Sequence, residues 1–366
     1  MAHRILITGA SGYLGGTLLA RLESAGLPPY EKLYALVRTA GQANAVKQYG
    51  AESTTFDTKD EVATKEFIVA NKITIVFFLI DAMRSELQVN FIKALAEVKK
   101  ATGRDVHFLH VRCPDYPAGI DSDFFLKTSG AKIFSSHAGA PTDRPLYDDE
   151  LGLYDIQRAQ KSAIPLMNSA IATNNTVIEQ AESHGVRAYI FVPCIVYGKG
   201  EGFGNPISIQ TVAIVKAAKA VGWVCSVDSG RPTWPVCHVL DNAHLYLELL
   251  RQILSDKNPG SGKNGYYLAS PGSVAWQDLY AGMAAALAKR GIISDATVQR
   301  ASDETMADMG AALGCPKEIV PLQLGGLCTF TARNGEKIGW RPEFPSTHIL
   351  DTADEEVALI LDNLDR

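Results

Sequence analysis

The 366-residue sequence has no C-x-x-C pair among its six cysteines, no apolar run of membrane-spanning length and no surplus of basic residues. Scattered cysteines favour reduced thiols over a disulfide framework or a zinc site. The longest apolar run, around 73–80, has the length of a strand, whereas a transmembrane helix needs about 20 residues. With 35 Lys and Arg against 40 Asp and Glu, the formal charge of −5 argues against a dedicated binder of nucleic acid or anionic membranes.

Internal repeats, low-complexity tracts and long charge runs are also missing, and the N-terminus opens on a strand pattern rather than a secretory leader. Hydrophobic residues make up 46% and charged residues 20% of the chain, so it can bury a sizeable core. This composition excludes a disordered chain, a fibrous repeat and a disulfide-stabilised miniprotein. We therefore expect a cytoplasmic globular protein with one large and one smaller domain.

The first half of the chain alternates short apolar runs with helical patterns, which is typical of a parallel sheet covered by helices. Strands are expected at 4–7, 32–37, 53–56, 73–80, 106–110 and 188–192, and helices at 13–25, 87–101 and 176–184. After about residue 203 the alternation becomes irregular, with helices expected near 207–220, 275–290 and 302–313. We predict a large domain over 1–202 and a smaller α+β domain over 203–366, with 236–254 returning to the large one.

A glycine-rich turn follows the first predicted strand. The run Thr8-Gly9-Ala10-Ser11-Gly12-Tyr13-Leu14-Gly15 leads from strand into helix, as a dinucleotide-binding turn requires. Gly9 would permit the tight turn, Gly12 would let the backbone approach a pyrophosphate, and Gly15 would let the helix pack against the strand. The pyrophosphate would then meet the N–H groups of the helix N-terminus. The pattern predicts a Rossmann-type, doubly wound parallel sheet.

The TGxxGxxG form of this turn resembles the short-chain dehydrogenase/reductase superfamily, in particular its extended and atypical branches, which include NAD-dependent epimerases and NmrA-like proteins. Val192-Pro193-Cys194-Ile195-Val196-Tyr197-Gly198 resembles that branch's R-P-x-x-V-Y-G segment, and 234–241 resembles its V-H-V-x-D element. Two C-terminal signatures are matched by 265–268 and 338–342, and Asn90 falls where the branch often carries an asparagine. The resemblance implies cofactor contacts from Thr8, Gly9, Ser11, Gly12, Tyr13, Leu14, Gly15, Arg38, Asp57, Thr58, Leu79, Ile80, Pro193 and Val196.

The end of the second predicted strand bears on the choice of cofactor. NAD-preferring members carry an acidic residue there, which holds the adenosine ribose hydroxyls. Here the strand ends in Arg38, whose guanidinium can bind a 2′-phosphate through paired hydrogen bonds. NADP(H) is therefore favoured over NAD(H), with Ser11 as a further hydroxyl contact; the alternative is that Arg38 is only a solvated strand end. By resemblance, Asp57 and Thr58 flank the adenine, and Leu79 and Ile80 line the cofactor cleft.

The catalytic pattern of the superfamily is altered. Members that move hydride usually have Ser or Thr after the fifth strand and a Tyr-x-x-x-Lys on the next helix, where the Lys lowers the pKa of the Tyr. Ser129 resembles the serine element and Tyr154 lies 25 residues later, but Arg158 stands where Lys is expected. Lys161 would lie on nearly the same helix face as Tyr154 if the helix continued that far. In this alignment Ser129 orients the substrate, Tyr154 is the general acid/base, and Arg158 or Lys161 tunes it.

A second alignment counts back from the strand at 188–192. Glu179 then fits the K-x-x-x-E helix of the atypical branch, the lysine position falls on Asn175 and the tyrosine position on Ile171. No proton-transfer pair exists in this alignment, and Tyr154 lies in an added segment. The first alignment is preferred, because Pro165 is expected to break the helix and allow an insertion. In both alignments the Tyr-x-x-x-Lys is not intact.

Residues 111–127 interrupt an otherwise continuous match, because 106–110 would run directly into 128–130 without them. These seventeen residues correspond to 51 nucleotides. This stretch of DNA would begin with GT, as every Val codon does, and could end with AG, as one of the Lys codons does, which are the sequences expected at the two ends of an intron. The seventeen residues are therefore interpreted as a retained small intron or as a genuine loop beside Ser129. The coding DNA decides, since an opening other than GT or a closing AAA codon removes the splice-site argument. Asp148-Asp149-Glu150 is interpreted as a solvated turn rather than a metal site.

The sequence predicts an NADP(H)-dependent oxidoreductase that interconverts a carbonyl and an alcohol on a small organic substrate. One alternative is a catalytically degenerate NADP(H)-binding sensor or scaffold of the NmrA-like kind, and another is a non-redox isomerase or epimerase. We expect no metal ion, no nucleic-acid partner and no membrane partner, and we leave a homodimer open.

Overall fold

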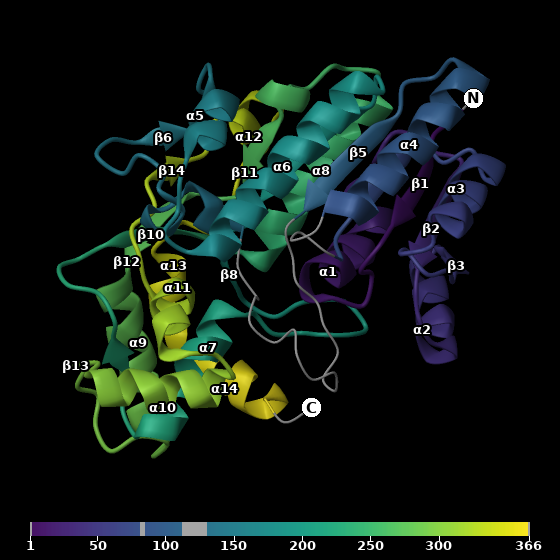
Figure 1. Cartoon of the computed structure of the whole chain (residues 1–366). Helices are drawn as coiled ribbons and strands as arrows, with labels where there is room; N and C mark the ends of the chain where they lie inside the picture. Colours follow the sequence, from purple (N-terminus) through teal and green to yellow (C-terminus); the bar gives the residue numbers. More distant parts are fainter. Residues whose placement is uncertain (1, 81–84, 112–129, 365–366) are drawn as a thin grey trace.

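The computed structural model describes residues 2–80, 85–111 and 130–364. A seven-stranded sheet lies at its centre, and every neighbouring pair of strands is parallel (Figure 1). The strand order is β11-β7-β5-β4-β1-β2-β3. These strands are β1 (Arg4–Ile7), β2 (Lys32–Leu36), β3 (Glu52–Thr54), β4 (Ile75–Phe78), β5 (His107–Val111), β7 (Arg187–Val192) and β11 (Tyr266–Leu268). The predicted Rossmann-type α/β fold is confirmed.

Helices cover both faces of this sheet (Figure 1). On one face α1 (Tyr13–Leu22) packs against α8 (Val239–Leu254), and on the other α4 (Ser85–Thr102) packs against α3 (Glu61–Ala70) and α6 (Pro165–Ser183). The two faces follow from right-handed crossovers that run one way from β1 to β2 and the other way from β4 to β5. All four residues of β4 are fully buried, as expected of a central strand in such a sheet.

A second group of elements forms the lower part of the molecule in Figure 1. A three-stranded sheet pairs β8 (Ile195–Tyr197) in parallel and β12 (Gly272–Ala275) in antiparallel fashion with β10 (Thr233–His238). Around it lie α7 (Gln210–Val221), α9 (Trp276–Lys289), α10 (Asp303–Leu313), α11 (Val320–Leu324), α13 (His348–Asp351) and α14 (Ala353–Asn363). Two short strand pairs are β9 (Cys225–Ser226) with β13 (Gln299–Arg300), and β6 (Leu146–Tyr147) with β14 (Phe330–Thr331). The other helices are α2 (Ala40–Ala45), α5 (Leu153–Ala159) and α12 (Asn334–Lys337).

One helix starts well before its predicted position. The helix expected at 176–184 is the end of α6, which begins at Pro165. Proline is compatible with the first turn of a helix because the N–H that it lacks has no intrahelical acceptor there. Pro165 therefore begins a helix, and α5, which carries Tyr154, ends at Ala159, so the expected break in the helix near Pro165 is present.

The chain returns to the large sheet after residue 203. Strand β11 pairs with β7 at the sheet edge, and α8 packs on α1. The C-terminal half of the sequence thus supplies elements to both groups, while the division at 202 stays a prediction. No helix in the described ranges is long and apolar enough to span a bilayer. The five cysteines that the structure describes are buried free thiols; Cys113 lies outside these residues.

Candidate functional site

The glycine-rich turn joins β1 to α1 at the carboxyl edge of the large sheet. Gly9 has a φ of +67°, and a Cβ atom there would lie 2.7 Å from the carbonyl oxygen of Leu79. A Cβ on Gly15 would lie 2.3 Å from the carbonyl oxygen of Gly9. Gly12 caps the helix and donates its N–H to the same Gly9 oxygen at 3.0 Å. Backbone that carries no side chains at the start of a helix is the arrangement that fits the pyrophosphate of a dinucleotide.

Side chains of the turn fix it to its surroundings. Thr8 donates its hydroxyl to the carbonyl oxygen of Phe77 at 3.3 Å and accepts the N–H of Leu79 at 2.8 Å, which ties β1 to the end of β4. Tyr13 donates its hydroxyl to the carbonyl oxygen of Gly198 at 2.6 Å. Leu14 is buried in the core. Thr8, Tyr13 and Leu14 therefore hold the turn in place through contacts within the protein.

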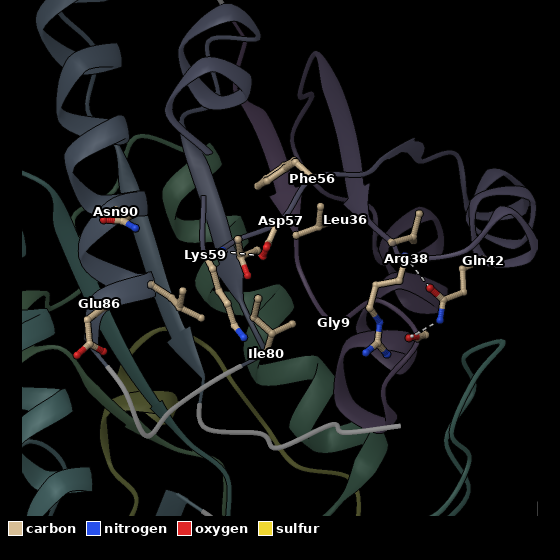
Figure 2. A pocket seen from close by; sticks show the side chains of 14 residues that line it. Gly9, Leu36, Arg38, Gln42, Phe56, Asp57, Lys59, Ile80, Glu86 and Asn90 are labelled. Atoms are coloured by element: carbon tan, nitrogen blue, oxygen red, sulfur yellow. Dashed lines mark hydrogen bonds between the residues drawn. The ribbon is translucent and has the colours of Figure 1, made fainter. Parts of the chain in front are cut away.

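A cavity of about 590 Å³ opens beside the turn (Figure 2). It lies where β1 separates β2 from β4, the point at which the strand order of the sheet changes direction and ligands bind in doubly wound folds. Its volume is in the range of cofactor sites. It is lined by Gly9, Ser11, Leu36, Val37, Arg38, Gln42, Phe56, Asp57, Thr58, Lys59, Ile80, Glu86, Leu87 and Asn90. The lining contains six of the predicted cofactor residues, namely Gly9, Ser11, Arg38, Asp57, Thr58 and Ile80.

Two cations and two carboxylates share this lining. Arg38 stands on one side of the cavity, and Lys59, Glu86 and Asn90 line the other parts (Figure 2). Among the described residues, neither Arg38 nor Lys59 forms an ion pair. Asp57 accepts the backbone N–H of Lys59 at 2.9 Å, so its carboxylate stabilises the loop after β3. The two positive charges thus have no counter-charge bound to them within the described ranges, and they are available to an anionic ligand.

The predicted cofactor residues Leu79, Pro193 and Val196 are not among the residues that line the cavity. Leu79 carries the carbonyl group against which Gly9 packs. The carbonyl oxygen of Pro193 accepts the N–H of Ala131 at 2.9 Å. Val196 lies in β8, paired with Cys237 of β10. Their roles as cofactor contacts stay predictions.

Tyr154 lies at the opposite end of the strands from the cavity. Its hydroxyl donates to the carboxylate of Glu179 at 2.5 Å, near the end of α6 that leads into the start of β7. The ammonium of Lys263, in the turn before β11, lies 5.0 Å from the centre of its ring. These neighbours place Tyr154 at the amino ends of the strands, whereas the cavity lies at their carboxyl ends. The position does not fit the acid/base role predicted for Tyr154.

The electrostatics of Tyr154 also oppose that role. Burial and the hydrogen bond to Glu179 raise the pKa of the Tyr154 hydroxyl to about 12. A tyrosine that exchanges a proton with a substrate near neutral pH needs a lowered pKa. The structure thus gives Tyr154 a neutral hydroxyl that joins α5 to α6.

The remaining predicted catalytic residues are not gathered at the cavity either. Arg158 lies on the same short helix α5, with an exposed side chain. Lys161 is also exposed, in the link between α5 and α6, where its backbone packs against Gly139. Ser129 and the greater part of 111–127 lie outside the described residues. Tyr154, Arg158 and Lys161 therefore do not form the predicted constellation.

The structure favours the second alignment. Helix α6 is the element that crosses the sheet to β7, and its nineteen residues include neither Tyr nor Lys. Ile171 and Asn175 occupy the positions that this alignment assigns to the tyrosine and the lysine. Tyr154 then belongs to an added segment, which the structure shows as the separate helix α5.

Several residues that line the cavity have no predicted role. Lys59 follows Asp57 and Thr58 directly, so its place after the third strand is the signal that could have found it. Phe56 lines the cavity, and the centre of its ring lies 5.2 Å from that of Phe67. Gln42 lies six residues beyond the end of β2, where no sequence pattern marks it. Asn90, noted from the resemblance, also lines the cavity.

Tyr154→Phe is expected to leave cofactor binding and turnover unchanged and to lower the free energy of unfolding by about 1.5–3 kcal/mol, because a hydrogen bond to a charged carboxylate is lost. Denaturant unfolding measures the stability, NADPH titration measures cofactor binding, and NADPH consumption measures turnover. Tyr147→Phe is the matched control, since that hydroxyl forms no hydrogen bond within the described residues. A tenfold loss of turnover at unchanged stability would restore a catalytic role for Tyr154.

Comparison with known proteins agrees with the fold. The chain is 22% identical over 310 residues to the oxidase ucsJ of an Acremonium species, covering 82% of this chain and 83% of that protein. The UDP-glucose 4-epimerase of Bifidobacterium longum, solved with NAD+ and UDP, superposes with a TM-score of 0.59 at 14% identity, covering 99% of both chains. The dTDP-glucose 4,6-dehydratase of Bacillus anthracis, solved with NAD, gives 0.59 at 12% identity, covering 100% of this chain and 98% of that one.

The family assignment comes from a model that spans most of the sequence. Residues 5–261 match the NAD dependent epimerase/dehydratase family. This range begins in β1, includes the glycine-rich turn and the cavity lining, and ends shortly before β11. The chain therefore belongs to the NAD dependent epimerase/dehydratase family.

Proposed function

We propose that this protein is an NADP(H)-dependent oxidoreductase that interconverts a carbonyl and an alcohol on a small organic substrate. Its family supports a nicotinamide-dependent enzyme of the short-chain dehydrogenase/reductase type. The observation that carries the choice of cofactor is Arg38, which lines the cavity at the end of β2 without an ion-pair partner in the described chain. A guanidinium there suits a 2′-phosphate, whereas ribose hydroxyls are usually held by an acid.

The residues present fit a dinucleotide. The backbone of the glycine-rich turn, where Gly9 and Gly15 leave no room for a Cβ atom, would hold the pyrophosphate, and Arg38 would hold the 2′-phosphate. Phe56 would pack against the adenine, and Asp57 and Thr58 would flank it. When bound, the nicotinamide supplies hydride chemistry. The chain's own contribution at this cavity is binding and orientation, because α6 offers no tyrosine or lysine for proton transfer.

Arg38→Ala is expected to weaken NADPH binding about 10- to 100-fold, because a hydrogen-bonded charge pair contributes about 1.5–3 kcal/mol. NADH binding should change less than about threefold, because NADH lacks the phosphate that Arg38 would hold. Fluorescence titration with both cofactors measures the ratio. Arg300→Ala, at an exposed position on β13, removes the same charge away from the cavity and should leave both affinities unchanged. Equal losses for both cofactors would contradict the proposed preference.

A second candidate function is an NADP(H)-binding sensor or scaffold without turnover. The absence of Tyr and Lys from α6 is the observation that favours it. The two candidates separate when NADPH binding is measured beside NADPH consumption on a panel of aldehydes and ketones. Consumption with any substrate supports the oxidoreductase, whereas tight binding without consumption supports the sensor.

A further inference from the structure

We propose that Gln42 is a positioning residue that sets the preference between NADP(H) and NAD(H), by holding the hydroxyl of Ser11 and the backbone of Arg38 on the adenosine side of the cavity. This inference deepens the proposed function and depends on its preference for NADP(H). All three residues line the same cavity.

The carboxamide of Gln42 bridges two loops that are otherwise separate in the sequence. Its Oε1 accepts the backbone N–H of Arg38 at 2.9 Å, and its Nε2 donates to the hydroxyl oxygen of Ser11 at 3.3 Å (Figure 2). The backbone N–H of Gln42 in turn donates to the hydroxyl of Thr39 at 3.2 Å. The glycine-rich turn and the end of β2 are thereby joined across the cavity wall.

The orientation of the amide follows from these partners. A backbone N–H can only donate, so Oε1 must face Arg38 and Nε2 must face Ser11. The Ser11 oxygen therefore accepts from Gln42, and its own hydrogen is directed elsewhere. No described residue accepts that hydrogen. Ser11 thus presents a hydroxyl donor beside Arg38, and two donors together suit a phosphate.

A glutamate at this position would reverse that arrangement. Its carboxylate can only accept, so it would draw the Ser11 hydrogen toward itself and away from the cavity. It would also place a negative charge beside Arg38, which would repel a 2′-phosphate and could accept ribose hydroxyls instead. One amide-to-carboxylate change therefore acts on the phosphate, the arginine and the serine together.

The test compares Gln42→Glu, Gln42→Met and Gln48→Glu in the full chain. Gln42→Met keeps the size of the side chain and loses both hydrogen bonds, and Gln48→Glu adds the same charge at an exposed position outside the cavity lining. Dissociation constants are measured for NADPH, NADH and adenosine 2′,5′-bisphosphate, and thermal unfolding verifies that each variant is folded. The ratio of NADPH to NADH affinity is a readout that a purely structural role would not change.

Gln42→Glu is expected to lower the affinity for NADPH and for adenosine 2′,5′-bisphosphate about 10- to 100-fold, with NADH affinity unchanged or higher. Gln42→Met should lower the NADPH affinity by a smaller factor, and Gln48→Glu should match the wild type. If the wild type prefers NADPH and Gln42→Glu keeps the wild-type ratio, the inference about Gln42 is wrong while the proposed cofactor preference stands. If the wild type shows no preference for NADPH, the proposed function fails first.

Discussion

Replacing Gly204 by alanine is expected to weaken NADPH binding at least tenfold and to lower the free energy of unfolding by about 1–3 kcal/mol, the usual cost of an extra methyl group in a closely packed site. A Cβ atom on Gly204 would lie 1.9 Å from the carbonyl oxygen of Ser11. The atom that the methyl group would meet belongs to the backbone, so no flexible side chain can move aside. This clash can be relieved only if the glycine-rich turn or the segment that carries Gly204 shifts.

The segment 200–205 has little freedom to shift. Asn205 donates its N–H to the same Ser11 oxygen at 3.0 Å, and Glu201 donates its N–H to the hydroxyl of Thr17 at 3.2 Å. The carboxylate of Glu201 also pairs with Arg21 on α1. Gly202 lies so close to α1 that a Cβ there would be 2.5 Å from the Cα of Gly16. Part of the displacement must therefore fall on the glycine-rich turn, and this would distort the cofactor site.

Gly41→Ala is the matched control for Gly204→Ala. A Cβ on Gly41 would meet nothing closer than the hydroxyl oxygen of Thr39 at 3.9 Å, and the position lies in helix α2. Alanine should leave binding unchanged there and add up to about 1 kcal/mol of stability. Chemical denaturation and NADPH titration measure both variants. If Gly204→Ala bound NADPH with wild-type affinity and stability, the close approach of the segment to the turn would have no role in the site.

The strongest sequence patterns located the scaffold well. Helices α9 and α10 begin within one residue of their predicted starts at 275 and 302. For α10 the reason is local, because the Ser302 side chain caps the helix by accepting the N–H of Thr305 at 3.1 Å. Arg38 could be predicted at the cavity because it directly follows a strand whose carboxyl end must lie at the ligand edge.

The site predictions that failed did so because residue spacing in the sequence does not determine where a side chain lies in the fold. The 25-residue separation between Ser129 and Tyr154 does not tell which edge of the sheet the tyrosine reaches. Helices α5 and α6 pack side by side, and Glu179 bonds the Tyr154 hydroxyl at the amino edge. Gln42 was missed because its role depends on the reach of its side chain across to Ser11.

The Asp148 side chain illustrates the same limit, because 148–150 was interpreted as a solvated turn, and for Asp148 this is wrong. Asp148 is 2% exposed. Its carboxylate accepts three backbone N–H groups, from Leu268 at 3.0 Å, Arg333 at 2.7 Å and Asn334 at 2.9 Å. One side chain thus joins the strand β6 region, the end of β11 and the start of α12. The charge cluster looked like a turn because its backbone partners lie more than a hundred residues away.

Asp148→Ala is expected to lower the free energy of unfolding by about 3–5 kcal/mol, because three N–H donors lose a charged acceptor at a buried site. This is a large share of the roughly 5–15 kcal/mol that stabilises a typical domain. Denaturant unfolding measures the loss. Asp143→Ala, at an exposed position five residues earlier, should cost less than about 0.5 kcal/mol. Similar losses in the two variants would contradict the anchoring role of Asp148.

The same carboxylate predicts a pH dependence of stability. Burial raises the pKa of Asp148 from 3.8 to about 6, although its three backbone hydrogen bonds lower it in part. The folded protein therefore holds a proton between about pH 4 and pH 6 that the unfolded chain releases. On account of this group the free energy of unfolding should fall as the pH rises through that window, by about 2 kcal/mol. In Asp148→Asn this contribution is absent, whereas Asp143→Asn should retain it. Urea unfolding of the three proteins at pH 4.5 and pH 7 measures the difference, and parallel behaviour of Asp148→Asn and wild type would show that Asp148 is already ionised at the lower pH.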